Sequence, residues 1–210
     1  MGLHLMIGLI GLLYILIFGG MALLRREGLS IRFAVESVIL TALAVIFIVF
    51  LQVPIHPVLF LLLLYLVTLR VRIFVDLANS FAARGRYAQA EKIYQLASQI
   101  GPDPTNKLIV NVNRAIMLLQ RGETDQTINL FNEILNPVNR GNLGVKYEAA
   151  AHYNLAVAYL RQNNLSKATI EFNSTIDSWP GSLYANRAQQ ALDRQQHKDS
   201  SPVEDKPTGN

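Results

Sequence analysis

The spacing of apolar and small residues between Phe74 and Pro102 constrains this chain more than any other feature. A helix brings residues three, four and seven positions apart onto one face, so two runs with these intervals predict two helices that pack together. Ala78 and Ala90 let the two backbones approach closely. Gly85 marks the end of the first helix, and Pro102 follows the second as a stop signal. The two apolar stripes consist of Phe74, Leu77, Ala78 and Phe81, then Ala90, Tyr94 and Ala97.

This pattern resembles the signature of the tetratricopeptide repeat, W-x2-L-G-x2-Y…A-x3-F…P. A second clear copy consists of Leu155, Ala156, Tyr159, Ala168, Phe172 and Pro180, with Asn163 or Asn164 in place of the turn glycine. A degenerate copy between the two retains Ala115, Leu118, Gly122, Phe131 and Ile134. In that copy the positions expected to hold an aromatic residue, a leucine and a small residue are Asn111, Arg114 and Thr127.

The resemblance covers about residues 71–195 and implies stacked helix pairs closed by one further helix. The implied repeats are 71–104, 108–141 and 149–182, with a longer loop around Arg140–Gly144 and a capping helix over 182–195 that Ser182 begins. From Gln196 the composition turns polar, so residues 196–210 predict a disordered tail. The predicted fold is all-α: N-terminal transmembrane helices, then an α-solenoid of about three helix pairs with a C-terminal capping helix.

Residues 1–70 predict a membrane domain. The chain is 51% hydrophobic, and the excess lies almost wholly before residue 76. About 20 apolar residues cross a hydrocarbon core of about 30 Å, so we expect three helices at about 3–24, 33–51 and 57–72. A cleaved signal peptide is the alternative for the first helix. It is disfavoured because no basic segment precedes it and Arg25 and Arg26 follow it.

The third apolar segment is short. Val58–Leu69 gives about 18 Å of helix, so either the residues from Val53 add depth or the helix continues to Val75 while its arginines snorkel outward. A re-entrant segment is the alternative. Because no Gly or Pro separates Leu69 from Ala83, we expect the helix to run directly into the first repeat and hold the repeats against the membrane surface.

Basic residues predict an N-terminus outside the cell and repeats in the cytoplasm. Lys and Arg concentrate in cytoplasmic loops, and here the second connection has none. The predicted location is a multi-pass protein of a bacterial inner membrane or a cyanobacterial thylakoid. The relevant residues are Arg25, Arg26 and Arg32 in the first loop, then Arg70, Arg72, Arg84 and Arg86 after the third span.

The sequence gives little support to catalysis, transport or nucleic-acid binding. Glu36 is the one acidic residue expected inside a span, where it either takes part in proton or ion movement or reaches the headgroup layer, which we favour. The absence of Cys excludes disulfides and thiolate metal sites. We predict no enzyme activity, cofactor or metal, and the net charge of +4 is too evenly spread for nucleic acid. The histidines, which lack metal-ligand spacing, are His4, His56, His152 and His197.

The resemblance implies a peptide-binding groove on the first helix of each repeat. In the family, asparagines at the position of Asn113 and Asn154 often hydrogen-bond the backbone of an extended peptide; the alternative is two solvated asparagines. The basic set that clamps a C-terminal carboxylate in some relatives is absent, and the apolar members suggest a partly apolar peptide or helix. The predicted groove consists of Arg72, Val75, Asp76, Asn79, Val112, Asn113, Ile116, Tyr153, Asn154, Val157 and Arg161.

These features predict a membrane-anchored scaffold or assembly factor. It would hold a subunit of a membrane complex, or a peptide segment of one, through its cytoplasmic groove. The Gln- and Asn-rich repeats resemble cyanobacterial sequences, and membrane-anchored members of the family include photosystem assembly factors of thylakoids. The alternative is a permanent structural subunit of an envelope or secretion complex. The predicted partners are therefore a protein and the lipid bilayer.

Overall fold

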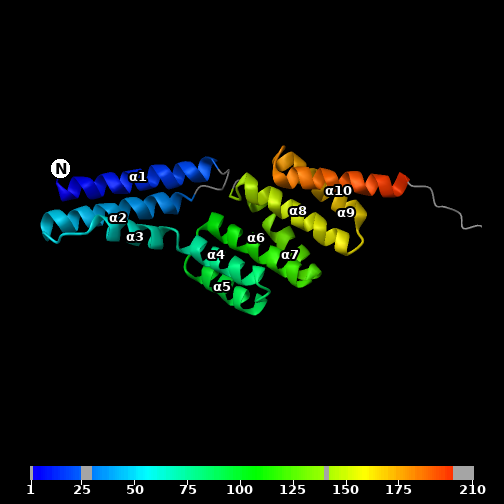
Figure 1. Ribbon diagram of the computed structural model, residues 1–210, viewed down its shortest axis with the longest axis horizontal. Coiled ribbons are helices and arrows are strands. Elements are labelled where there is room, and N and C mark those ends of the chain that lie inside the picture. The colour runs from blue at the N-terminus through cyan, green and yellow to red at the C-terminus, as the bar shows by residue number, and fades with distance from the viewer. Residues whose placement is uncertain (1, 25–29, 140–141, 201–210) are drawn as a thin grey trace, which may run out of the picture.

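The computed structural model describes residues 2–24, 30–139 and 142–200. Within these residues the chain forms ten α-helices, one short 3-10 helix and no strand, so the predicted all-α fold is confirmed. Figure 1 shows two parts along the long axis: α1 to α3 form a bundle at one end, and α4 to α10 form a stack of helix pairs at the other. Arg25, Arg26 and Arg140 lie outside the described residues.

The bundle consists of α1 (Leu3–Leu24), α2 (Ile31–Phe50) and α3 (Pro57–Thr68). Its interior contains Ile7, Tyr14 and Leu64, and leucines such as Leu16, which is 60% exposed, cover its outer surface. Helices that are apolar all round suit a lipid environment, and α1 and α2 are each long and apolar enough to cross a membrane. At Gly11 the two helices approach so closely that Thr41 leaves no room for a Cβ atom.

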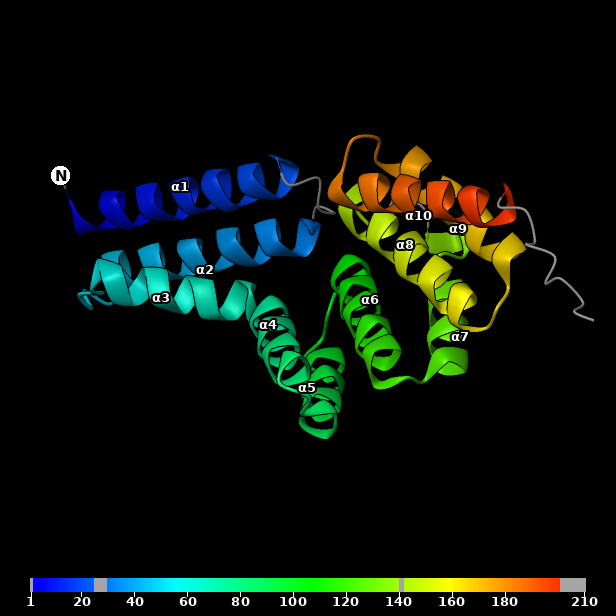
Figure 2. The same ribbon diagram turned by 45° about the vertical axis from the view of Figure 1, so that its right-hand side comes forward.

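The expected continuous helix from the bundle into the first repeat is wrong. α3 ends at Thr68, and α4 (Arg70–Ala83) leaves it at an angle of 71° (Figure 2). The Thr68 hydroxyl donates a 2.7 Å hydrogen bond to the Leu64 carbonyl, a contact that bends helices. Arg70 Nη1 donates to the Val67 carbonyl, which a continued helix would have used for its own ladder. Side-chain hydrogen bonds thus stabilise the bend, and the predicted helix over 57–72 stops early.

Three helix pairs and one final helix follow the bend. Each pair reverses at a residue with positive φ: Gly85 at 71°, Gly122 at 92° and Asn163 at 58°. Asn163 is therefore the residue that replaces the turn glycine in the third pair, because an asparagine tolerates this left-handed conformation. The helices are α4, α5 (Tyr87–Gln99), α6 (Pro104–Arg121), α7 (Thr124–Ile134), α8 (Val145–Arg161), α9 (Leu165–Ser178) and α10 (Leu183–Ser200); the 3-10 helix is Pro137–Asn139.

The residues that define the repeat pattern form the interior of the stack. Ala78, Ala90 and Tyr94 have no exposed surface, and neither does Phe131; Phe172 has 1%. The Ser182 hydroxyl accepts a 3.0 Å hydrogen bond from the Ala185 amide, so the predicted cap of the last helix is confirmed. That helix continues to Ser200, beyond the predicted end at 195, and the rest of the predicted disordered tail lies outside the described residues.

The degenerate second repeat forms a helix pair because polar contacts replace the missing apolar ones. Arg114 pairs with Glu91 on the preceding α5, at 2.7 Å between Arg114 Nη2 and Glu91 Oε1. Thr127 is fully buried, and its hydroxyl donates a 2.8 Å hydrogen bond to the Glu123 carbonyl of the same helix. Thr127 therefore satisfies its polar group inside the stack, whereas Arg114, whose side chain is 38% exposed, pairs at the edge of the stack.

Candidate protein-binding surface

The first helices of the three pairs are neighbours in the structure. α4 packs against α6, and α6 packs against α8, so the predicted groove residues lie on adjacent helices. We call the solvent-reachable members of this set the inner face. Asp76 and Arg161 are exposed. The half-buried members are Arg72, Asn79, Asn113, Ile116, Tyr153, Asn154 and Val157.

Two of the predicted groove residues are core residues. Val75 is 4% exposed and Val112 is 1% exposed, and each belongs to a cluster of buried apolar side chains between the repeats. Both carry β-branched apolar side chains on the helix stripe that packs against the neighbouring repeat. They therefore have no surface to offer a partner, and we leave them out of the inner face.

A chain of hydrogen bonds joins the first two repeats beneath the inner face. The Tyr94 hydroxyl donates to Asn79 Oδ1, and Asn79 Nδ2 donates to Asn113 Oδ1 at 3.0 Å. Asn113 Nδ2 donates in turn to the Ile109 carbonyl at 2.8 Å. Burial raises the pKa of Tyr94, and the nearby Glu91 carboxylate adds to the effect, so the phenol remains a proton donor. Asn113 is thus a structural link between α4 and α6.

The Asn154 side chain makes fewer hydrogen bonds than the Asn113 side chain. Within the described residues its side chain makes one hydrogen bond, from Nδ2 to the Ala150 carbonyl of its own helix at 2.7 Å. A side-chain amide has two N–H donors and an acceptor oxygen, so Asn154 retains a donor and an acceptor for a partner. The two asparagines occupy the same repeat position but differ in how many of their hydrogen-bonding groups are already used.

Aromatic residues form the end of the inner face next to α10. The Tyr153 ring lies 5.8 Å from the Phe172 ring and 5.6 Å from the Tyr184 ring, measured between centroids. Burial raises the pKa of the Tyr184 phenol. Arg161 donates a hydrogen bond to the Leu119 carbonyl near the end of α6, which ties the third repeat to the second. Tyr153 and Tyr184 therefore make the end of the surface next to α10 aromatic.

A cluster of charged and polar residues joins the bundle to the repeats. Glu36 on α2 accepts two hydrogen bonds from Arg70 on α4, at 2.7 Å and 2.9 Å, and a third from Arg32 at 2.6 Å. Arg32 also donates to the Gly101 carbonyl at 2.5 Å. Ser30 donates to Asp103, the N-cap of α6. We call Ser30, Arg32, Glu36, Arg70 and Asp103 the junction cluster.

Sequence reasoning identified Glu36 but missed its partners. Arg70 is separated from Glu36 by 34 positions, and Asp103 from Ser30 by 73, so a single sequence does not show that they meet. The one available signal was the i, i+4 spacing of Arg32 and Glu36 at the start of α2. The structure places Glu36 at the repeat-facing end of the bundle and pairs it with two arginines.

A cavity of about 210 Å³ opens beside the junction cluster. Residues of α1, α2, α3, α4 and α6 line it, among them the inner-face residues Arg72 and Asp76.

At the other end of the stack, His152 Nδ1 lies 2.6 Å from Glu171 Oε2. Among the described residues no group of three His, Cys, Asp or Glu side chains could hold a metal ion.

The chain forms a stack of antiparallel helix pairs, each of which reverses at a residue with positive φ. This is the arrangement of helical-repeat proteins. Within that class, residues 150–182 match the tetratricopeptide repeat family. Such repeats are interaction modules that bind proteins or peptides, and they are typically non-catalytic. No curated protein and no solved structure matches the chain.

Proposed function

We propose that this protein is a membrane-anchored scaffold that holds a segment of another membrane protein against the inner face. The observation that supports this most is the junction cluster, because charged hydrogen bonds, rather than a flexible linker, connect the apolar bundle to the repeats. A face held in this way meets its partners at a fixed height above the bilayer. Partners that are themselves embedded in the membrane present their loops at that height.

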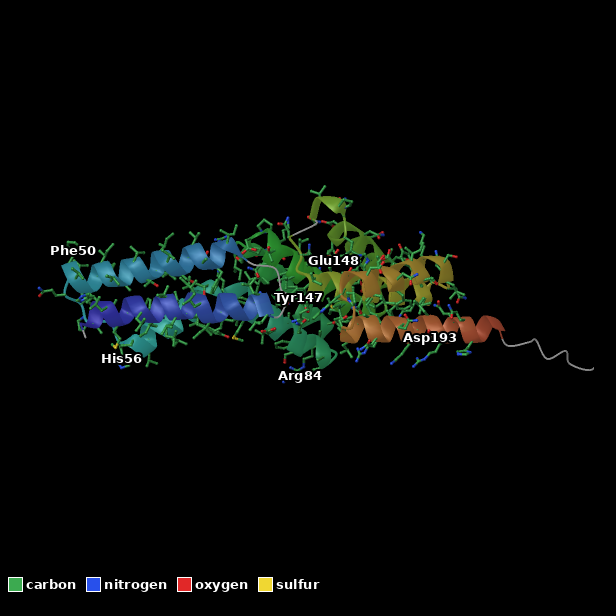
Figure 3. The ribbon with its side chains drawn as sticks, turned by 90° about the horizontal axis from the view of Figure 1, so that it is seen from above. Phe50, His56, Arg84, Tyr147, Glu148 and Asp193 are labelled. Carbon is green, nitrogen blue, oxygen red and sulfur yellow. The ribbon has the colours of Figure 1, made fainter. Side chains whose placement is uncertain are left out.

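In this proposal α1 and α2 cross the membrane, and α3 returns the chain to the side on which α2 began. Phe50 and His56 lie at the end of the bundle away from the repeats, as Figure 3 shows. Arg32 and Arg70 lie at the other end, and the preference of basic residues for the cytoplasm supports cytoplasmic repeats and an outer N-terminus. A bacterial inner membrane or a cyanobacterial thylakoid would both suit this arrangement.

The chemistry of the inner face favours an extended, partly apolar segment. Asn154 offers a donor and an acceptor to a peptide backbone, while Tyr153, Ile116 and Val157 offer apolar contact on either side. We propose that the partner is a subunit of a membrane complex, held during its assembly, as in thylakoid photosystem assembly. An assembly factor should be substoichiometric and found with incomplete complexes, whereas a permanent subunit would be stoichiometric with the mature complex.

Asn154→Ala tests the inner face, and Asn173→Ala is the matched control on the exposed side of α9. Partners cross-linked in intact membranes should fall about tenfold for Asn154→Ala, the equivalent of about 1.4 kcal/mol, and stay unchanged for the control. Asn113→Ala is a poorer test because it also removes the link between α4 and α6. Equal capture by Asn154→Ala and the wild type would refute the proposed surface.

Cysteine labelling tests the proposed topology, because the natural chain has no cysteine. His56→Cys should react with an impermeant maleimide added outside, since the α2–α3 connection faces that side. Ser166→Cys, at an exposed position of α9, should react only after the membrane is opened. Labelling of both positions from the same side would contradict the topology.

A further inference from the structure

The first helix pair has an apolar face that no repeat of the described chain covers. α6 packs against α4 and α5 from one side, and in Figure 2 it lies on the side away from the bundle. On the opposite side, where a preceding repeat would stack, Leu77 on α4 is 45% exposed and Leu96 on α5 is 48% exposed. A helical-repeat stack needs a polar outer surface on its end repeats to remain soluble. This apolar surface therefore requires another explanation.

Helix periodicity shows which residues share this surface. Leu77 and Arg84 are seven positions apart along α4 and its C-cap, so they lie on one side of that helix. Ile93 and Leu96 are three positions apart on α5 and lie together in the same way. Figure 3 shows Arg84 at the outer edge of the first repeat. We call the following residues of the first pair the end face: Leu77, Arg84, Arg86, Lys92, Ile93 and Leu96.

The end face is basic as well as apolar. Arg84, Arg86 and Lys92 are exposed, and their side chains make no ion pair or hydrogen bond within the described part of the chain. The acidic residues of the same helix pair lie elsewhere: Glu91 pairs with an arginine of α6, and Asp76 belongs to the inner face. Apolar side chains among unpaired basic groups match the interfacial layer of a membrane that contains anionic lipids.

The bend lies beside the middle of α1, well before that helix ends. Thr68, the last residue of α3, is hydrogen-bonded to the Tyr14 hydroxyl at 2.7 Å. The residues of α1 beyond Tyr14 give about 15 Å of further helix. Leu16 and Leu24 in this part of α1 are 60% and 85% exposed. In the proposed function these leucines contact lipid, so the apolar layer of the membrane extends past the level of the bend.

α4 rises too little to leave that layer. Its 14 residues give about 21 Å of helix, and the 71° angle directs only about 7 Å of this along the axis of α3. α4 therefore lies at the level of the last turns of α1. α5 returns along α4 to Ile100, whose carbonyl accepts a 3.3 Å hydrogen bond from Arg70 at the bend. The whole first pair thus stays near the membrane, with its end face on the bundle side.

We propose that the end face is a lipid-binding surface. Its three apolar residues enter the interfacial layer of the bilayer, while its three basic residues bind the phosphates of anionic phospholipids around them. The first repeat would then rest on the membrane and leave the inner face free for protein. This inference rests on the membrane crossing of α1 and α2 in the proposed function, but not on any partner of the inner face.

Fluorescence quenching in nanodiscs tests the contact with lipid, because the natural chain has no cysteine. Leu77→Cys and Leu96→Cys each carry a bimane label, and each disc holds a single copy of the full chain in brominated choline phospholipid. Both labels should be quenched by the bromine atoms. Leu165→Cys on α9 is the matched control, since Leu165 is 50% exposed, and its label should not be quenched. A label at Leu16→Cys on the bundle should be quenched in every case.

A second measurement tests the basic residues. A brominated anionic glycerol phospholipid should quench the Leu96→Cys label more strongly than the same amount of brominated choline phospholipid, which measures how far anionic lipid is enriched there. Lys92 lies one helical turn from Leu96, so Lys92→Gln should lower the enrichment about fivefold. Arg194→Gln, at an exposed position of α10, should leave it unchanged. Equal enrichment in Lys92→Gln and the parent protein would refute the role given to the basic residues.

Unquenched labels at both end-face positions would overturn the proposal, and access of aqueous iodide to them would then show what covers the end face. Loss of access when two copies share a disc would indicate a dimer, and loss of access only in native membranes would indicate another protein. A quenched label at Leu16→Cys in that case would refute this inference alone. No quenching at Leu16→Cys would refute the membrane crossing on which both proposals rest.

Discussion

Neutralising Glu36 should loosen the repeats from the bundle. The Glu36→Gln side chain keeps its size but loses the negative charge that two arginines share. Arg70 Nη1 and Nη2 donate to separate oxygens of Glu36, at 2.7 Å and 2.9 Å, in the bidentate geometry that makes such pairs strong. Glu36→Gln leaves the two guanidinium groups close together with Asp103 as the remaining anion of the junction cluster.

The exposure of the two side chains sets the expected free-energy cost of opening the junction. Exposed ion pairs contribute about 0–1 kcal/mol, and breaking a fully buried pair costs about 3–5 kcal/mol. The side chains of Arg70 and Glu36 are 23% and 21% exposed, so we expect a cost of about 2–3 kcal/mol for opening the junction. This corresponds to an increase of about 30-fold to 150-fold in the population of the open junction.

Hydrogen exchange of the full chain in nanodiscs measures that population directly, even when the open form is rare. Amides of the α3–α4 bend and of the first turn of α6 should exchange about 30-fold to 150-fold faster in Glu36→Gln, by the same conversion from free energy. Amides around Phe131 should not change. Glu133→Gln, at an exposed position of α7, is the matched control.

Arg70→Gln should accelerate exchange at least as much, because it also removes the hydrogen bonds to the Val67 and Ile100 carbonyls. The double variant should add little to Arg70→Gln, because the ion pair is already absent there. Unchanged exchange at the bend in Glu36→Gln, or fully additive effects of the two substitutions, would refute the view that this pair holds the junction closed.

Three further predictions concern the repeats, with unfolding in urea followed by the fluorescence of the single tryptophan. Phe131→Ala should destabilise the repeats by about 3–5 kcal/mol, because its ring is fully buried; a loss below about 1 kcal/mol would show that the core is not packed there. Gly122→Ala should cost about 1 kcal/mol, since φ is 92° at this turn; a gain in stability would contradict the left-handed turn. Tyr94→Phe should cost about 1–2 kcal/mol by leaving Asn79 Oδ1 without its donor. Because burial raises the pKa of Tyr94 above 10.0, its phenol in the unfolded chain loses a proton first as the pH rises, so wild-type stability should fall above pH 10 and fall less in Tyr94→Phe; equal alkaline loss in both proteins would contradict this assignment.

The sequence predicted the helix pairs well because the evidence for them is local. Apolar residues at intervals of three and four specify a stripe, and a residue that tolerates positive φ specifies the turn, so Gly85 and Gly122 were identified without a structure. Even the degenerate pair was recognisable, since Ala115 and Phe131 kept their positions in the core. The cap at Ser182 was equally local.

The bend and the junction cluster could not be predicted because they depend on long-range contacts. Leu69 carries no signal that a helix ends there, and a threonine inside an apolar segment usually does not end one. The break becomes stable only when Thr68 also hydrogen-bonds Tyr14 on α1, at 2.7 Å, and Arg70 reaches Glu36 on α2. Val75 and Val112 were misassigned for a related reason: repeat position alone does not tell which side of a first helix the next repeat covers.

If the inner face binds a partner as proposed, the bend and the junction cluster together determine which partners it can reach. A flexible linker would let the repeats sample many orientations, and a membrane-bound partner would then have to lose that freedom on binding. Here Glu36, Arg70 and Asp103 restrict the orientation of the repeats, so in the proposed function more of the contact energy at Asn154 and Tyr153 would be available for affinity. In the proposed function the same rigidity would restrict the partners to segments that leave the bilayer within reach of the inner face. Variants that open the junction should therefore weaken partner capture even though they leave every residue of the inner face unchanged.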